Sequence, residues 1–143
     1  MPGSYLYPDE RARFVYISDV LDTLVLRDVR QKYRIRNAEQ LERTCEFLMD
    51  NVGNISSLKS MAATLSQAGL KINDKTLAAY IDHLCDAFAF YRVRRFDVAG
   101  KKYLSTGDKY YLADHSFRYA KLGTRRLDFG RIYENMVAIE LMR

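Results

Sequence analysis

The chain has 143 residues and a formal net charge of +5, with 48% hydrophobic and 29% charged residues. This composition is typical of a globular domain and excludes disordered and collagen-like chains. No apolar run reaches the roughly 20 residues of a membrane span and no apolar signal segment opens the chain, so we expect a cytoplasmic protein without a membrane partner.

Residues 1–9 hold both prolines and predict a turn-rich lead-in. A long helix is expected over 10–30, because apolar residues recur there at helical spacing: Phe14, Ile17, Leu21, Leu24, Val25 and Val29. Many basic residues accompany this helix and the segment after it, and we interpret them as a solvated surface: Arg11, Arg13, Arg27, Arg30, Lys32, Arg34 and Arg36.

Three further helices are predicted in sequence, separated by short turns. The first covers about 38–51 after an Asn37 cap, with Leu41, Cys45, Leu48 and Val52 inward and Gly53 as its stop. The second starts at Ser56 or Ser57, buries Leu58, Met61, Ala62 and Leu65, and ends at Gly69. The third, capped by Asn73 or Asp74, turns Leu77, Tyr80, Ile81, Leu84 and Phe88 inward.

After Phe88 the helical period gives way to the alternation of a strand. The stretches predicted as strands are "AFYRVRRFDV", "KKYL" and "DKYYLAD", with a turn at Ala99 and Gly100 between the first two. Three helices followed by a hairpin is the order of a winged helix. The expected fold is therefore mainly α with a small β-wing (α+β): a long N-terminal helix, a winged helix-turn-helix and a C-terminal helix.

Residues 89–126 hold 10 basic and 3 acidic residues, a local positive charge of the kind that nucleic-acid-binding surfaces carry. The outward face of the third helix is a poor reader of bases, since it carries mainly Lys75, Ala78, Ala79, Asp82, His83 and Asp86. The candidate nucleic-acid-binding residues lie in the wing instead: Arg92, Arg94, Arg95, Lys101, Lys102 and Lys109. The alternative is that these cations form the solvent face of a half-buried hairpin.

No chemical site is complete within the chain. It has neither GxxxxGK[ST] nor GxGxxG, and His83 and His115 have no partners at a catalytic spacing. Cys45 and Cys85 are expected to be buried free thiols, with a regulatory thiol or a metal site as the alternatives. We assign no catalytic residue, no metal and no cofactor.

The last helix, predicted over 132–142, presents an apolar stripe formed by Ile132, Met136 and Ile139, with or without Val137, while Glu134, Asn135 and Glu140 lie off it. Such a stripe needs a surface to cover it. We expect a homodimer through the two end helices, including Leu21 and Leu24 of the long helix; the alternative is that both helices pack on their own chain.

Several stretches resemble the middle of bacterial and archaeal AAA-type ATPases: "LVLRDVRQKYRIRN", "TLAAYIDHLCDAFAFYRVRRFDVAGKKYL", "DKYYLADHSFRYAKLG" and "GRIYENMVAIELMR". In that family a nucleotide-binding domain precedes a winged helix and a restriction-endonuclease-like domain of unknown function. The resemblance implies an internal fragment: 1–36 as the linker and long helix that leave the absent ATPase domain, 37–126 as the winged helix, and 127–143 as the first helix of a truncated nuclease-like domain.

The resemblance also implies that ATP and magnesium belong only to the absent ATPase domain, and that Glu134 matches an acidic residue of the nuclease-like motif. The first functional hypothesis is a non-catalytic winged-helix region that couples the ATPase and nuclease-like domains of its parent. The second is a weak, salt-dependent nucleic-acid contact through the wing. A third, an enzyme in its own right, has no closed site in the sequence to support it.

Overall fold

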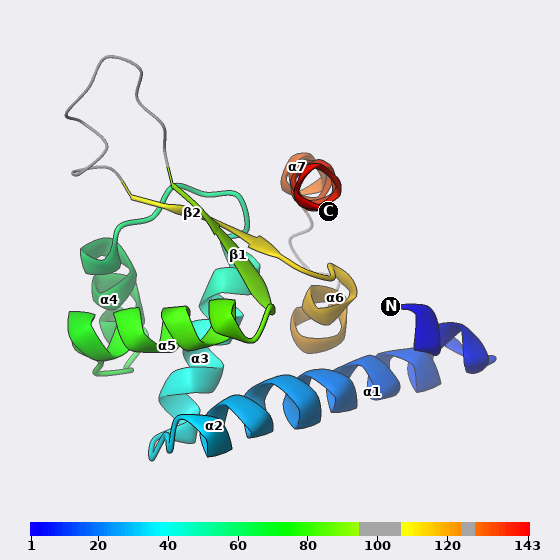
Figure 1. The fold of residues 1–143 in the computed structure, drawn as a ribbon, viewed down its shortest axis with the longest axis horizontal. Coiled ribbons are helices and arrows are strands. Elements are labelled where there is room, and N and C mark those ends of the chain that lie inside the picture. Colours follow the sequence, from blue (N-terminus) through cyan, green and yellow to red (C-terminus); the bar gives the residue numbers. More distant parts are fainter. Residues whose placement is uncertain (95–106, 124–127) are drawn as a thin grey trace.

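The structure, a computed structural model, describes residues 1–94, 107–123 and 128–143, apart from the side chains of Pro2 and Leu24. It is mainly helical with one two-stranded antiparallel sheet, which confirms the expected α+β class. The long helix runs along one side of the molecule, and α7 lies on the far side of the sheet from it (Figure 1). No helix in the described ranges is long and apolar enough to cross a membrane.

The predicted long helix is confirmed. After a short 3-10 helix, η1 (Pro2–Leu6), it is built without a break from α1 (Glu10–Val20), a π-helical segment (Leu21–Arg27) and α2 (Asp28–Lys32). In the π segment the hydrogen bonds reach one residue further, which rotates the residues that follow. Leu26, five residues after Leu21, is therefore buried, while Val25 is only partly buried.

The next three helices match the prediction in their positions: α3 (Ala38–Asp50), α4 (Leu58–Gln67) and α5 (Asp74–Asp86). Leu58, predicted to be buried, is 37% exposed because it stands at the first position of α4. Each N-cap side chain accepts a backbone N–H bond from three residues further on, at Asn37 (3.1 Å), Ser57 (3.2 Å) and Asn73 (2.8 Å). Gly53 and Gly69 have φ values of +75° and +88°, so the chain turns at both predicted stops.

Phe88 does not face inward as predicted. Helix α5 ends at Asp86, and Phe88 follows in a left-handed conformation with φ +55° and 71% of its surface exposed. Because the chain leaves the helical path here, Ala89 and Phe90 are buried in its place.

The sheet pairs β1 (Phe90–Val93) with β2 (Lys109–Leu112), in the register Phe90↔Leu112 and Val93↔Lys109. This confirms strands within the first and third predicted stretches. The predicted turn at Ala99 and Gly100 and the predicted strand over 101–104 lie outside the described residues.

The outer edge of β2 is closed by three contacts from two segments, the loop between α3 and α4 and the helix α7. Asp108, just before the strand, forms an isolated antiparallel bridge with Ser56. The N–H of Gly53 donates to the carbonyl of Tyr110 (3.0 Å). Asn135 of α7 bonds to both backbone groups of Leu112, accepting from its N–H (2.7 Å) and donating to its carbonyl (2.9 Å). Backbone groups of Asp108, Tyr110 and Leu112 that point away from β1 thus have hydrogen-bond partners. A third strand would supply partners at the same alternate positions.

Two helices complete the fold: α6 (Ser116–Leu122) and α7 (Phe129–Met142). Helix α6, which was not predicted, packs between the long helix and α3 (Figure 1). Helix α7 begins three residues earlier than predicted, because Asp128 caps it. The apolar stripe predicted for this helix is wrong in part. Ile132 is buried as expected, but Met136 is 57% exposed, and Asn135, expected off the stripe, is buried with 1% of its surface exposed.

Candidate interaction site

Arg92, the first predicted nucleic-acid-binding residue, points back onto its own chain. Its guanidinium donates to the carboxylate of Asp82 on α5 (2.5 Å), lies 3.7 Å from that of Asp108, and sits over the ring of Tyr110. Three-quarters of the side chain is removed from solvent. Arg92 therefore joins the sheet to α5 and has little surface left for a phosphate.

Lys109 and Glu134, predicted for two different roles, bind each other. The Lys109 ammonium donates to the Glu134 carboxylate (2.7 Å), and the hydroxyl of Tyr111 donates to the same oxygen (2.8 Å). These two hydrogen bonds, from Lys109 first and then Tyr111, hold the pKa of Glu134 below its usual range, and the bond to Glu134 raises the pKa of Lys109. The carboxylate also lies 3.3 Å from the position where a Cβ at Gly53 would stand. This cluster attaches α7 to the sheet.

The remaining wing candidates are only partly described. Arg94 is exposed at the end of β1. Arg95, Lys101 and Lys102 lie outside the described residues. Of the six predicted residues, the structure thus places two in ion pairs within the chain and one at the surface.

Two further cations from the basic region 89–126 are also used inside the fold. Arg118, which is 6% exposed, donates to Asp50 (3.1 Å). The ammonium of Lys121 lies 2.6 Å from a carboxylate oxygen of Glu42 and 3.2 Å from one of Asp22. The excess positive charge of this region is therefore smaller at the surface than the sequence indicates.

The outward face of α5, predicted to be a poor reader of bases, is occupied by the end of the long helix. Tyr33 stacks on His83 with ring centroids 3.6 Å apart and planes 12° apart, and its hydroxyl donates to Asp86 (3.0 Å). With Asp82 bound to Arg92, the acidic residues of this face serve intramolecular contacts. Phosphates would also be repelled by the carboxylates.

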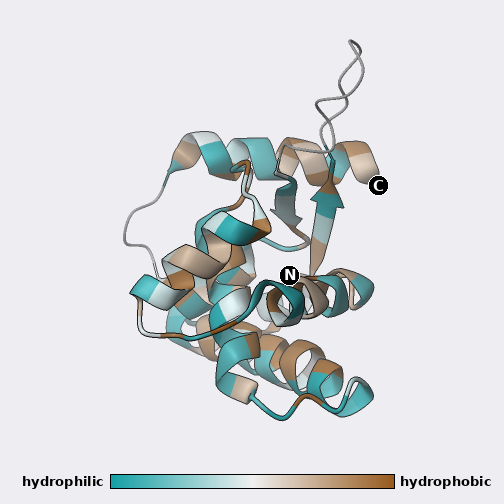
Figure 2. Ribbon diagram, turned by 90° about the vertical axis from the view of Figure 1, so that its left-hand side faces the viewer, coloured by the Kyte–Doolittle hydropathy of each residue, from teal (hydrophilic) through white to brown (hydrophobic). Residues whose placement is uncertain are grey.

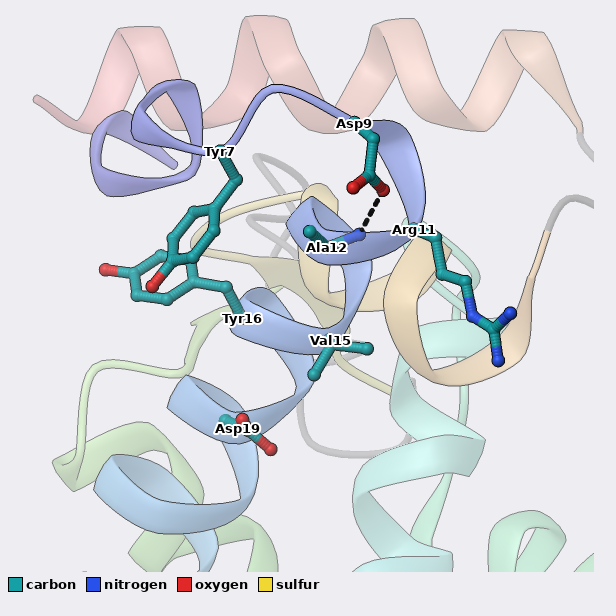
Figure 3. A pocket seen from close by; sticks show the side chains of 7 residues that line it. All are labelled: Tyr7, Asp9, Arg11, Ala12, Val15, Tyr16 and Asp19. Carbon is teal, nitrogen blue, oxygen red and sulfur yellow. Dashed lines mark hydrogen bonds between the residues drawn. The ribbon is translucent and has the colours of Figure 1, made fainter.

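A hollow of about 380 Å³ lies beside the start of α1 (Figure 3). The rings of Tyr7 and Tyr16 meet on one side of it with centroids 5.0 Å apart. Asp9 is already used as the helix cap, since it accepts the N–H of Ala12 (2.7 Å). The described residues that line the hollow include no histidine, cysteine or lysine.

The cysteines are free, as predicted. Cys45 is buried, and burial raises the pKa of its thiol to about 12; burial likewise raises the pKa of the partly buried Cys85 to about 11. Both thiols are therefore poor nucleophiles at neutral pH. Within the described ranges, no three side chains of metal-binding type come together.

Comparison with known proteins gives a family without a known activity. A family profile described as a domain of unknown function, DUF8612, matches residues 1–128. An uncharacterised protein of Haemophilus influenzae is 31% identical over 140 residues, which are 98% of this chain and 35% of that protein. An uncharacterised protein of Methanocaldococcus jannaschii is 26% identical over 142 residues, 99% of this chain and 31% of that protein. The chain spans about a third of the length of these relatives. No solved structure matches it.

These matches overturn the resemblance to AAA-type ATPases. The family that covers residues 1–128 is a domain of unknown function, and the names of both relatives state no activity. The identification of the chain as an internal fragment of such an ATPase is wrong, and the ATP, magnesium and partner domains inferred from it lose their support.

Proposed function

The chain belongs to the DUF8612 family of unknown function, and we propose that it is a non-catalytic winged-helix module that works by binding a protein partner. The order of elements supports the winged helix: α3, the bridging residue Ser56, α4, α5, β1 and β2. A winged helix has the same order, with a short strand between its first two helices that joins the sheet. Here Ser56 supplies that strand position by pairing with Asp108.

The observation that carries the proposal is the apolar outer face of α7. Phe129, Tyr133, Val137 and Leu141 recur every four residues, and each is more than half exposed. Residues four apart share one side of a helix, so these four form a single stripe. A contiguous exposed apolar surface of this kind is typical of a protein–protein interaction site. We call these four residues the α7 stripe.

A second copy of the chain is the partner we propose for the α7 stripe. The four positions are symmetric about residue 135, so an antiparallel pairing sets Phe129 against Leu141 and Tyr133 against Val137 of the other copy. A two-fold interface needs this self-complementarity. Gly130 then faces Glu140, where a residue without a side chain leaves room for the carboxylate. On the long helix, Ile17, Leu21 and Val29 are buried within their own chain, so the interface we propose is confined to α7.

Light scattering at micromolar concentration tests this proposal. We expect twice the 16.7 kDa of one chain, and a single-chain mass for the variant Val137→Arg with Leu141→Arg. The control is Tyr5→Arg with Leu6→Arg, which adds the same charges to exposed apolar residues at the other end of the chain and should stay dimeric. A wild-type protein that remains a monomer at every concentration would refute the proposal.

Nucleic-acid binding through the wing is the second candidate function. The exposed Arg94 favours it, whereas the internal pairing of Arg92 and Lys109 weighs against it. Such binding would be weak, independent of sequence and strongly dependent on salt, since only phosphate contacts are on offer. Arg94→Glu with Arg95→Glu should then abolish it.

A further inference from the structure

A second basic surface lies at the end of the long helix, away from the wing. Residues 27–36, called the basic turn below, contain one acidic residue, Asp28, and five cations, all exposed: Arg27, Arg30, Lys32, Arg34 and Arg36. The segment projects at the lower left of Figure 1, at the end of α2. This charge density is greater than that of the described part of the wing.

The cations of the basic turn are not used inside the fold. Arg27 lies 3.7 Å from Asp28, with both side chains more than half exposed. Lys32 lies over the ring of Tyr33, 5.0 Å from its centroid. In the part of the chain that the structure describes, no carboxylate pairs with Arg30, Arg34 or Arg36. This differs from Arg92, Lys109, Arg118 and Lys121, which all have carboxylate partners.

The basic turn is held in a defined shape. Tyr33 is fixed to α5 by its stacking on His83 and its hydrogen bond to Asp86, and the N–H of Ile35 donates to the carbonyl of Arg30 (3.0 Å). Between them Arg34 adopts a left-handed conformation with φ +52°. Glycine adopts this conformation without strain, whereas an arginine adopts it at a cost in backbone energy. The arginine at this position therefore supplies a positive charge in spite of that cost.

Stabilisation of the helix explains only part of this charge. Cations in the last turn interact favourably with the negative end of the helix dipole, which accounts for Arg30 and Lys32. Arg34 and Arg36 lie beyond the end of α2 at Lys32, and the next helix begins at Ala38 with Glu39 in its first turn. Near the start of a helix the dipole interacts unfavourably with cations, so the helix dipole does not stabilise Arg36.

The surroundings favour a phosphate backbone over a protein as the partner. Within the basic turn itself no described large hydrophobic side chain is exposed; the exposed Phe88 follows Asp86, the α5 residue that Tyr33 contacts, and is a single apolar residue. A protein interface is centred on buried apolar or aromatic side chains, whereas contact with phosphates requires mainly cations. Four of the five cations are arginines, whose planar guanidinium can bind phosphate oxygens in pairs. We propose that the basic turn binds the phosphate backbone of nucleic acid, independently of base sequence.

Fluorescence anisotropy with a labelled DNA duplex of about 20 base pairs tests this inference, over salt concentrations from about 50 to 200 mM. With about four phosphate contacts, the logarithm of the binding constant should fall against the logarithm of salt with a slope of about −3.6. Arg30→Glu with Arg34→Glu and Arg36→Glu should weaken binding by about thirtyfold or more and flatten that slope.

The matched control is Lys59→Glu with Lys71→Glu and Lys75→Glu, three exposed lysines on or beside α4 and α5 that undergo the same change of charge. It should weaken binding by about threefold or less, through the general loss of net charge. Should the first variant fail to fold by circular dichroism, Arg30→Gln with Arg34→Asn and Arg36→Gln replaces it, since Asn tolerates the left-handed conformation.

The inference would be overturned by no binding at the lowest salt, by an equal loss in both triple variants, or by a loss confined to Arg94→Glu with Arg95→Glu. Single-stranded DNA and duplex RNA in the same assay determine which nucleic acid binds best. Tighter binding to anionic lipid vesicles or to a polyglutamate peptide would reject nucleic acid as the partner. The proposed dimer is judged separately, by mass.

Discussion

Asn135 closes the outer edge of the sheet with one amide side chain. It is fully buried and bonds to both backbone groups of Leu112. In Asn135→Ala those two groups stay buried without partners, so we expect a loss of about 2–4 kcal/mol in the free energy of unfolding, measured with urea. The control Asn54→Ala removes a partly buried amide bonded to the Asn51 side chain and should cost less than about 1 kcal/mol. Equal losses in the two variants would contradict this role.

The same residue shows why sequence reasoning misplaced part of the candidate site. A helical period assigns polar residues to solvent, and Asn135 departs from that rule because its partner is a backbone edge 23 residues earlier in the chain. Arg92 and Glu134 were likewise interpreted one residue at a time. Their roles depend on Asp82 and Lys109, which only the fold brings beside them.

At the scale of elements, the contact between α7 and the sheet should depend on pH. Lys109 and Tyr111 donate to Glu134 and lower its pKa from the usual 4.5, so the folded state favours the carboxylate. The resulting stabilisation is present above about pH 4.5 and is lost as the pH falls through the folded-state pKa. Because the Glu134 side chain is 41% exposed, screening by solvent limits this stabilisation to about 0.5–1 kcal/mol.

Urea unfolding of Glu134→Gln from pH 7 to pH 3 measures this effect. We expect the variant to be less stable than the wild type at pH 7 and the difference to shrink below about pH 4.5. Glu46→Gln, on α3, removes a carboxylate bonded to the nearby Arg43 and should show a small difference throughout. A difference for Glu134→Gln that is constant with pH would rule out this linkage.

Elements defined by local signals were predictable, and those defined by distant contacts were not. The starts of α3, α4 and α5 followed from Asn37, Ser57 and Asn73, which bond three residues along their own chain. Helix α6 has seven residues, too few to show a clear period, and two of its cations bind carboxylates far away in sequence. From the sequence alone, charged residues that form ion pairs within the fold cannot be distinguished from charged residues at the surface.

For the whole molecule, the two proposed surfaces lie far apart. In Figure 1, α7 is at the upper right and the end of α2 at the lower left, and Figure 2 shows α7 lying across the top of the molecule. A dimer formed through the α7 stripe would leave both basic turns uncovered. Two sites on one particle bind a long polyanion more tightly than one site does.

We therefore expect the monomeric variant Val137→Arg with Leu141→Arg to bind a duplex of several hundred base pairs at least about tenfold more weakly than the wild type, by loss of avidity. On a duplex too short to reach both turns, the two proteins should bind alike. Anisotropy on the short duplex and gel shift on the long one provide the comparison. The same ratio on both lengths would show that the two surfaces do not act together.

The closure of the sheet also has a consequence for synthesis. The Ser56 bridge and the Gly53 N–H come from residues made before β2, but Asn135 is made 23 residues after Leu112. A nascent chain that has folded through β2 therefore carries an open hydrogen-bonding pair at Leu112, the kind of edge on which neighbouring chains associate. We therefore expect chains that end before residue 135 to aggregate more readily than the full chain.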